Sequence, residues 1–318
     1  MNYIARFMSV ILVLGIFVSE VNAEQTRFSY SSIDNGTRFE YQWIDGTGAS
    51  KEVTFTLSSD ALNTAPTVQP NYRSPIMMRH MVVALQKEAQ SYDPRDAIVR
   101  IIPSRDNIDI EVKARQPARQ QEVIRAMNMA HKDAYNAYLF ENYYMEFTTS
   151  FNQKGIKPDH ARYILETTEA LIPASQAFYE KLVGNEDARA YLNTLLGWVQ
   201  SIPYDPLNDR LSSNGAGFAP PMGLLLQNKG DCDSKAVLTS ALVRAFLPDT
   251  SMIMVFLPKH ALLGVAINPL AHEETLVVND EIYVLYEPTG PALIPFGQVS
   301  ESTKRQLLTG RYTTETVN

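Results

Sequence analysis

The stretch NKGDCDSKAVLTSALVRAFL, residues 228–247, decides how the rest of the chain is interpreted. It holds Cys232, the only cysteine in 318 residues, after a glycine and between Asp231 and Asp233. The apolar run that follows predicts a helix over 233–247, with the thiol in its first turn. Unpaired N–H groups and the helix dipole favour the nucleophilic thiolate there. The aspartates repel a thiolate and are expected to cap the helix, so a strong nucleophile requires a histidine partner.

The candidate partner is His260, in the stretch FLPKHALLGVAI. Here a strand begins after a proline-marked bend, and a strand end holds a side chain rigidly while leaving it accessible. A structural histidine is the alternative. The four other histidines lie in polar helical stretches or in a connector, and we expect surface or hydrogen-bonded residues at His80, His131, His160 and His272.

An acid that orients the histidine would complete the set, and Glu287 ends the strand EIYVLYE. If a strand over 261–268 pairs antiparallel with the strand ending at Glu287, the latter meets His260. A meander with TLVV (275–278) between them would separate the two side chains. The triad therefore predicts that 269–280 is an excursion and not a central strand. The alternative for Glu287 is a solvated carboxylate at a strand end.

Three blocks, GDCDSKAVLTSALVRA, KHALLGVAI and YEPTG, together resemble the transglutaminase-like superfamily of cysteine enzymes. Its pattern is a G-x-C at a helix start, a histidine that opens a strand and an acidic residue that ends the next strand. GWVQSIPYDP (197–206) and FAPPMGLLLQNKGDC (218–232) are also similar to the approach to the cysteine in bacterial exported members. The resemblance covers residues 185–292 and is most specific in the cysteine block.

This resemblance implies a nucleophile at Cys232, a general base and later general acid at His260, and an orienting acid at Glu287. Many members have aspartate at the acid position, so the glutamate is a departure. The implied fold is α+β, a papain/transglutaminase-like core with the nucleophile helix packed on an antiparallel sheet. The Cys232 N–H is the expected first oxyanion donor. Gln227 and Trp198 are candidates for a second, the alternatives being a loop amide and a core aromatic residue.

The N-terminus MNYIARFMSVILVLGIFVSEVNA has the pattern of a secretory signal cleaved after Ala23. The apolar run from Phe7 to Val18 is too short for a comfortable membrane span, although an uncleaved anchor is the alternative. We therefore expect a periplasmic or secreted protein with no stable membrane anchor after cleavage. A lone cysteine in an exported chain cannot form an internal disulfide. A disulfide between two chains is a further alternative for Cys232.

Composition changes along the chain predict four segments. Aromatic and β-branched runs with DNGT and DGTG turns precede Ala114, whereas 117–200 reads as helix. The Pro/Gly-rich stretch 203–223 is expected to be a loop that walls the cleft. The segments are a signal peptide (1–23), a β-rich N-terminal module (24–115), a helical connecting region (116–182) and a transglutaminase-like catalytic domain (183–318).

The net charge of −7 and the lack of a basic block argue against a nucleic-acid partner. No Cys/His cluster has zinc spacing, HEE at 272–274 lacks calcium-loop spacing, and no cofactor is expected. The expected function is an exported thiol enzyme that attacks peptide or carboxamide carbonyls through a thioester, as a peptidase, amidase or transamidase. The expected partner is a protein or peptide substrate. The alternative is a non-catalytic binding or assembly module with the same fold, and the oligomeric state stays open.

Overall fold

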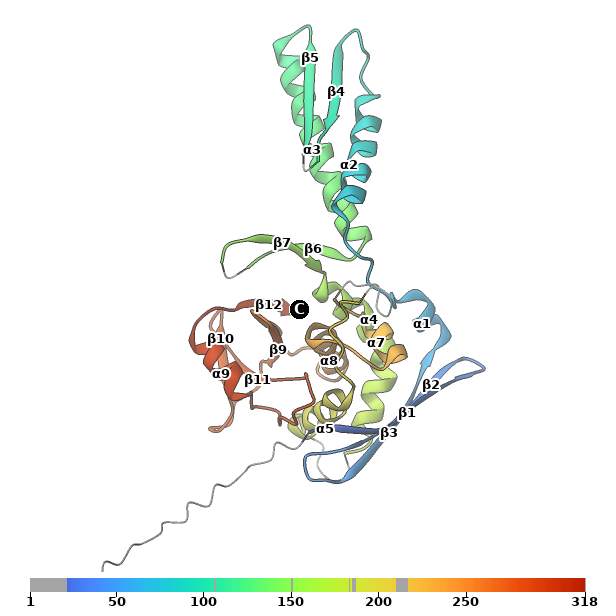
Figure 1. Ribbon diagram of the computed structural model, residues 1–318, viewed down its shortest axis with the longest axis vertical. Coiled ribbons are helices and arrows are strands. Elements are labelled where there is room, and N and C mark those ends of the chain that lie inside the picture. The colour runs from blue at the N-terminus through green and yellow to red at the C-terminus, as the bar shows by residue number, and fades with distance from the viewer. Residues whose placement is uncertain are drawn as a thin grey trace, which may run out of the picture.

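The computed structural model describes residues 22–105, 107–149, 151–182, 184, 187–209 and 217–317. The expected signal peptide lies outside these residues except for its last two, and so does the middle of the loop expected over 203–223. Within the described ranges, no helix combines the length and the apolar character needed to cross a bilayer. The protein is mixed α+β, with a β-rich N-terminal region and a curled antiparallel sheet flanked by helices (Figure 1).

The five-stranded sheet has the order β10-β11-β9-β8-β12, with every neighbouring pair antiparallel. Tyr286 of β11 faces Leu263 of β9, so β11 ends beside the start of β9. The strand β10 lies on the outer side of β11 rather than between β11 and β9. The expectation that 269–280 is an excursion from the centre of the sheet is thus confirmed. The strands are β8 (Met252–Leu257), β9 (His260–Val265), β10 (Thr275–Val278), β11 (Glu281–Tyr286) and β12 (Thr313–Val317).

The helix α8 (Cys232–Phe246) is the centre of the main body. Its residues from Ser234 to Val243 are all buried, because the helix packs against β9 on one side and against other helices around it. A helix that is enclosed on every side needs no polar face, which explains the run AVLTSALV. The surrounding helices are α4 (His160–Tyr179), α5 (Ala188–Ser201) and α7 (Pro221–Gln227).

The N-terminal sheet covers the opposite side of these helices (Figure 1). Its strands β1 (Glu24–Ile33), β2 (Gly36–Ile44) and β3 (Ser50–Ser58) form an antiparallel meander, as the turn signals predict. Alternate residues of β2 and β3 point inward and join the same hydrophobic core as α4, α5 and α8. The inward side chains are Phe39, Tyr41, Trp43, Val53, Phe55 and Leu57.

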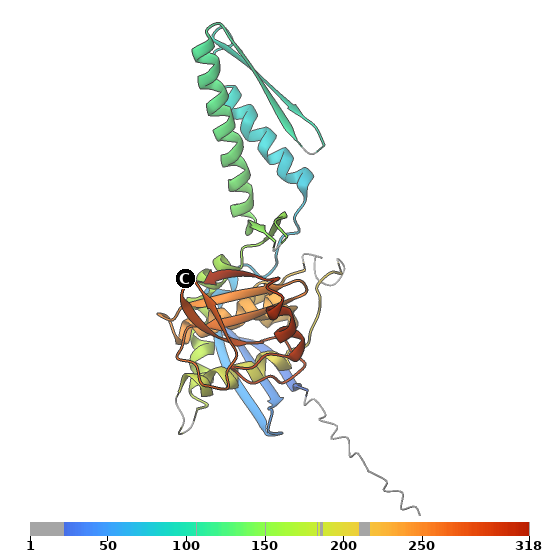
Figure 2. The same ribbon diagram turned by 90° about the vertical axis from the view of Figure 1, so that its left-hand side faces the viewer.

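An arm projects from this body (Figures 1 and 2). It consists of α2 (Ser74–Ala89), the antiparallel hairpin of β4 (Ala97–Pro103) and β5 (Ile108–Ala114), and α3 (Pro117–Glu141). These elements share a second hydrophobic cluster of their own, built around residues such as Leu85 and Met127. The packing therefore divides the described chain into a body and an arm. The predicted boundary at 115/116 falls inside the arm, and that at 182/183 separates two helices of the same core.

A short hairpin, β6 (Tyr144–Thr148) with β7 (Lys154–Pro158), links the arm to the body. The expectation of helix throughout 117–200 is wrong here. The helix α3 ends before Tyr143, which has a left-handed φ of 56° that interrupts regular helix. In the following strand, Met145 and Phe147 alternate with more exposed residues. The remaining short helices are α1 (Ser59–Thr64) and α9 (Glu301–Leu308).

Candidate functional site

The N-terminus of α8 is fixed by its cap. Asp231 Oδ1 accepts a hydrogen bond from the Ser234 backbone N–H at 3.0 Å and a second from the Ser234 hydroxyl. The same hydroxyl accepts a bond from the Ala219 N–H at 2.8 Å, which ties the end of the preceding loop to the helix. The predicted capping role is confirmed for Asp231, whereas Asp233 has a different partner.

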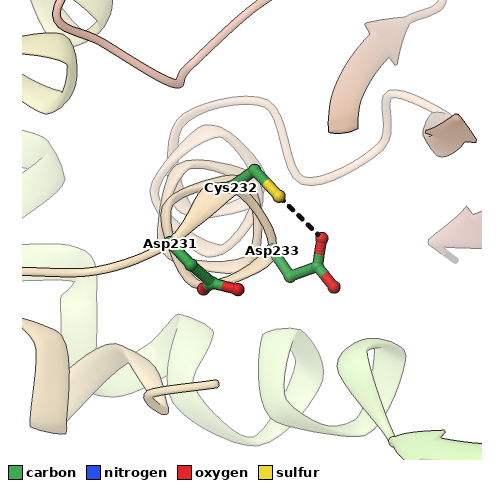
Figure 3. A group of neighbouring side chains, drawn as sticks. All are labelled: Asp231, Cys232 and Asp233. Atoms are coloured by element: carbon green, nitrogen blue, oxygen red, sulfur yellow. Dashed lines mark hydrogen bonds between the residues drawn. The ribbon is translucent and has the colours of Figure 1, made fainter. Parts of the chain in front are cut away.

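The Cys232 thiol donates a hydrogen bond to Asp233 Oδ1, with Sγ 3.3 Å from the oxygen (Figure 3). Cys232 is half-buried. Burial raises the pKa of the Cys232 thiol, and the charges of Asp233 and Asp231 raise it further. The Ala261 N–H at the sulfur acts in the opposite direction without reversing the shift. The repulsion by the two aspartates that the sequence predicts is therefore confirmed, and burial adds to it.

The imidazole of His260 lies beside Glu287, with Nε2 3.3 Å from Oε2. Glu287 is 3% exposed, and its other oxygen accepts a bond from the Ser300 N–H at 2.9 Å, just before α9. Burial acts to raise the pKa of Glu287, but hydrogen bonds from His260 and Thr303 outweigh it and hold the pKa below its ordinary value. The carboxylate thus stays charged next to the histidine.

The strand β9 brings the histidine to the thiol. Ala261 follows His260 directly, and its N–H lies within hydrogen-bonding reach of Cys232 Sγ. The charge of His260 also acts on Asp233 and lowers its pKa, against the larger effect of burial, which raises it. The hydrogen bond of the thiol nevertheless goes to Asp233 and not to the imidazole. Cys232, His260 and Glu287 therefore come together from α8, β9 and the end of β11. They form two pairs, Cys232 with Asp233 and His260 with Glu287.

The two predicted second oxyanion donors lie elsewhere. Trp198 is fully buried and packs against Tyr41 and Phe178, with ring centroids 5.1 and 4.9 Å away. Its indole N–H has no hydrogen-bond partner in this core, and the ring matches the core-aromatic alternative. Gln227 is exposed at the C-terminal end of α7, as in the loop-amide alternative. In the described structure neither side chain is hydrogen-bonded to the thiol, the histidine or the acid.

Two site residues were not singled out from the sequence. The buried side-chain amide of Gln200 donates to the Glu287 carbonyl at 2.8 Å and to the Ile294 carbonyl at 2.9 Å, which fixes the end of β11. Tyr204 forms a parallel bridge with Gly230 and is 52% exposed. Burial raises the pKa of Tyr204, and the charge of Cys232 raises it further. Only their positions within GWVQSIPYDP, before the cysteine, could have drawn attention to them.

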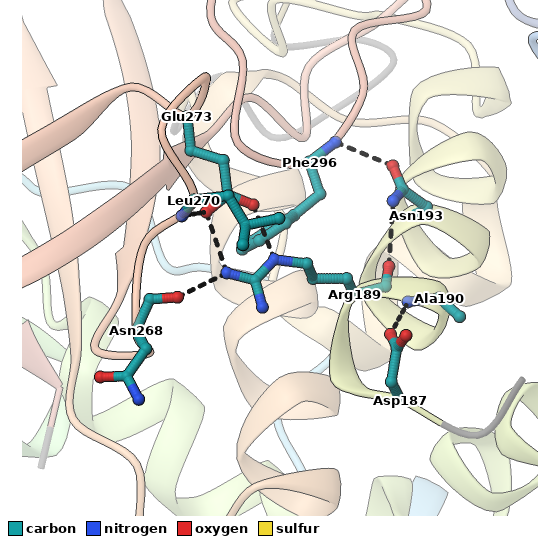
Figure 4. Close-up of polar contacts among 8 residues, drawn as sticks. All are labelled: Asp187, Arg189, Ala190, Asn193, Asn268, Leu270, Glu273 and Phe296. Carbon is teal, nitrogen blue, oxygen red and sulfur yellow. Dashed lines mark hydrogen bonds and ion pairs between the residues drawn. The ribbon is translucent and has the colours of Figure 1, made fainter.

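Arg189 fixes the segment between β9 and β11 that contains HEE (272–274). Arg189 of α5 binds Glu273 with two nitrogen–oxygen contacts of 2.7 and 2.9 Å and donates to the Asn268 carbonyl at 2.6 Å (Figure 4). Hydrogen bonds from Arg189 lower the pKa of Glu273, which also accepts the Leu270 N–H. A bidentate pair of this kind fixes geometry well. Glu273 therefore stabilises the segment between β9 and β11.

The histidine at the start of α4 departs from its expectation. His160 is 1% exposed, its ring lies 5.0 Å from that of Phe218, and neither ring nitrogen has a hydrogen-bond partner. Burial lowers the pKa of His160, and the nearby Lys157 lowers it further. It is thus a buried neutral imidazole rather than a surface or hydrogen-bonded residue.

Three groups at the start of α8 could hold a cation. The ligand atoms of Asp231, Cys232 and Asp233 lie within 4.8 Å of one another (Figure 3). In this arrangement Asp231 accepts from Ser234, and Asp233 accepts from the thiol. These bonds satisfy the group without an ion, and the expectation of no metal stays a prediction.

A cleft of about 560 Å³ opens beside the thiol. Asp233 forms part of its wall, and the rest comes from the β6–β7 hairpin, the end of β8 and the start of β12. Lys157 of β7 pairs with Glu315 of β12 and lies 4.0 Å from the ring centre of Phe256, which joins the hairpin to the sheet. The cleft therefore lies directly next to the carboxylate that binds the thiol.

No family model, curated protein or solved structure matches this chain. What the fold and the site define is a mixed α+β protein in which a helix-start cysteine and a histidine–glutamate pair meet at the end of an antiparallel sheet.

Proposed function

We propose that this chain is an exported thiol enzyme with a papain/transglutaminase-like core that acts on peptide or carboxamide carbonyls. The single observation that carries the proposal is the His260–Glu287 pair, 3.3 Å apart, beside a partly exposed thiol at a helix start. A buried carboxylate that orients an imidazole next to a nucleophile is the arrangement that Ser/Cys-His-acid enzymes share. We also propose that the protein is exported, because residues 1–23 have the pattern of a secretory signal.

In the proposed reaction, His260 takes the thiol proton while Sγ attacks the carbonyl carbon. Because Nε2 is held by Glu287, the proton goes to Nδ1. The new C–S bond pushes an electron pair onto the carbonyl oxygen, and the Cys232 N–H in the first turn of α8 is the donor that we propose for it. Since burial and two aspartates raise the pKa of the thiol, proton transfer and attack are coupled rather than preceded by a stable thiolate.

Collapse of this intermediate breaks the C–N bond, and the amine leaves with the proton from His260. A thioester between Cys232 and the acyl group remains. His260 then deprotonates a water or an amine, which attacks the thioester and releases an acid or a new amide with the thiol restored. Water gives a peptidase or amidase, and a lysine amine gives a transamidase.

The second candidate is a non-catalytic binding or assembly module with the same fold. The observation that favours it is the hydrogen bond from the thiol to Asp233, because a catalytic cysteine is expected to face its histidine. In this case Cys232 would be a structural residue of α8.

The test compares wild-type protein with Cys232→Ala on a peptide mixture from a digested bacterial proteome. Mass spectrometry then detects new termini, deamidated side chains or new isopeptide bonds. We expect products with wild type and none with Cys232→Ala. Absence of products from both proteins, together with peptide binding by both, would leave the binding module as the better reading.

A substrate-independent test measures the rate at which iodoacetamide labels Cys232 from pH 6 to 10. We expect His260→Ala to slow labelling near neutral pH, because the base that accepts the thiol proton is lost. The matched control is His272→Ala, which removes an exposed histidine of the connector. Equal labelling of the two variants across the range would count against the enzyme.

A further inference from the structure

The cleft beside Asp233 combines apolar walls with unbalanced acidic groups. Its lining comes from the β6–β7 hairpin, from the end of β8 and from β12. Asp233 joins it to the reaction site, because the same carboxylate accepts the thiol hydrogen bond. The cleft and the candidate site therefore share Asp233.

The apolar part of the wall is aromatic. Phe147, Phe151 and Phe256 all line the cleft. The ammonium of Lys157 already lies over two of these rings, 4.0 Å from the centre of Phe256 and 6.0 Å from that of Phe147. Rings of this kind attract cations through their faces and pack against aliphatic stems. The surface is thus suited to a long side chain with a positive end.

The charged part of the wall is acidic. Glu146, Asp233 and Glu315 supply three carboxyl groups against the single cation of Lys157. Lys157 is paired with Glu315 and its charge also acts on Asp233, so Glu146 is the lining carboxylate that has no cationic partner within the cleft. Glu146 accepts a neutral hydrogen bond from the Tyr135 hydroxyl at 2.8 Å, which orients the carboxylate without neutralising it. The lining therefore has an excess of negative charge.

The strand β12 adds a backbone edge. Among the described strands it is the outermost of its sheet, with β8 as its one neighbour, and its residues Thr313 and Thr314 line the cleft. An outermost strand presents unpaired N–H and C=O groups that an extended peptide can bind. The cleft thus favours an extended segment over a compact ligand.

We propose that this cleft is a specificity subsite that receives a lysine or arginine side chain of an extended peptide substrate, with the aliphatic stem against the aromatic wall and the charge toward Glu146. The inference rests on the proposed function for its link to the thiol. Peptide binding to the cleft can be measured without turnover.

The experiment uses the Cys232→Ala protein and a positional-scanning library of acetylated hexapeptide amides. One position at a time is lysine, arginine, norleucine or glutamate, and the others are random. We expect lysine and arginine to be enriched about fivefold over norleucine at one position, since one partly exposed charge contact contributes about 1 kcal/mol. Norleucine keeps the aliphatic stem, so the ratio isolates the charge.

The variant Glu146→Gln, made in the same background, should bring this ratio close to one, because it removes a cleft carboxylate and keeps its shape. The matched control is Glu122→Gln, which removes an exposed arm glutamate paired with Arg119. We expect that control to keep the preference. Thermal melts compare the folding of both variants, since each residue is exposed.

Two outcomes would overturn the subsite: no preference for lysine or arginine at any position, or a preference that survives Glu146→Gln. The proposed function fails separately. If basic peptides bind but wild-type protein leaves them unchanged, the subsite stands and the enzyme does not. If wild-type protein turns peptides over without regard to charge, the enzyme stands and the subsite does not.

Discussion

Glu287 Oε2 lies 3.3 Å from His260 Nε2, although the two residues are far apart in the chain. The antiparallel pairing of β9 and β11 places the start of one strand beside the end of the other, which brings these side chains together. Glutamate is longer than aspartate by one methylene. The Ser300 N–H before α9 binds the second carboxylate oxygen and so holds the longer side chain in place.

Replacing Glu287 with glutamine should lower turnover of any identified substrate by about 100-fold, because an oriented general base contributes at least that much. The amide keeps the shape but carries no charge to stabilise the imidazolium. Steady-state kinetics measure the effect as a loss in kcat. The matched control is Glu301→Gln, in the exposed first turn of α9. An unchanged kcat for Glu287→Gln would remove Glu287 from the mechanism.

Replacing Gln200 with leucine should destabilise the fold by about 2–4 kcal/mol, because one buried and one partly buried carbonyl lose their donor. These carbonyls belong to Glu287 and Ile294, so the end of β11 should also become less ordered. Urea unfolding gives the stability. The rate of Cys232 labelling by iodoacetamide, measured well below the unfolding midpoint, gives the effect on the site.

The control for Gln200 is Gln176→Leu on α4, whose side chain makes only an exposed hydrogen bond to Glu180. It should change stability by less than about 0.5 kcal/mol, as is usual for surface positions. If the Gln200 variant unfolds at the same urea concentration as this control, the hydrogen bonds of the Gln200 side chain do not contribute measurably to the stability of the fold.

Local patterns in the sequence predicted the strands of the N-terminal sheet and the start of α8, whereas the pairing that brings His260 to Glu287 was expected only on the condition that the two residues form a triad with Cys232. They succeeded because period-two alternation, turn residues and helix caps act over short distances. The rest depends on tertiary contacts. Nothing local indicates that Phe39 and Trp43 join the core of α8 while Leu85 belongs to a separate arm.

At the candidate site, too, local features could be predicted from the sequence, whereas those that depend on tertiary contacts could not. The helix start at Cys232 could be predicted, but the pKa of its thiol could not, because burial by distant segments decides the direction of the shift. The role of Gln200 was hidden for the same reason, since its partners lie on another element. Trp198 was misjudged as a donor because a lone aromatic residue gives no sign of which side of a helix the core lies on.

The hydrogen bond between Cys232 and Asp233 predicts a gain of reactivity when the carboxylate is removed. Burial is the largest cause of the raised thiol pKa, but Asp233 adds its charge and accepts the thiol hydrogen. Asp233→Asn should therefore lower the pKa of Cys232 and increase iodoacetamide labelling at pH 7 by about tenfold, the equivalent of one pKa unit. The labelling rate as a function of pH measures both. A pKa that stays the same or rises in this variant would show that burial alone sets it.

The buried cap at Asp231 predicts an unusual dependence of stability on pH. Burial raises the pKa of Asp231 from 3.8 to about 7, and the neighbouring Asp233 contributes. Between these values the folded state binds more protons than the unfolded state, so this group makes the protein less stable as pH rises. Asp231→Asn keeps an oxygen that can accept the bonds from Ser234 and cannot ionise.

Relative to wild type, the free energy of unfolding of Asp231→Asn should therefore increase from pH 4 to pH 7, by a few kcal/mol on the scale of about 1.4 kcal/mol per pKa unit, and then level off. Lys235 acts above this window, because burial lowers its pKa from 10.5 to about 7 and makes stability rise with pH there. Urea unfolding at pH 4, 5.5, 7 and 8.5 measures the difference, with Asp249→Asn at an exposed position as the control. A difference between Asp231→Asn and wild type that stays constant from pH 4 to 7 would mean that Asp231 ionises in the folded protein as it does in the unfolded chain.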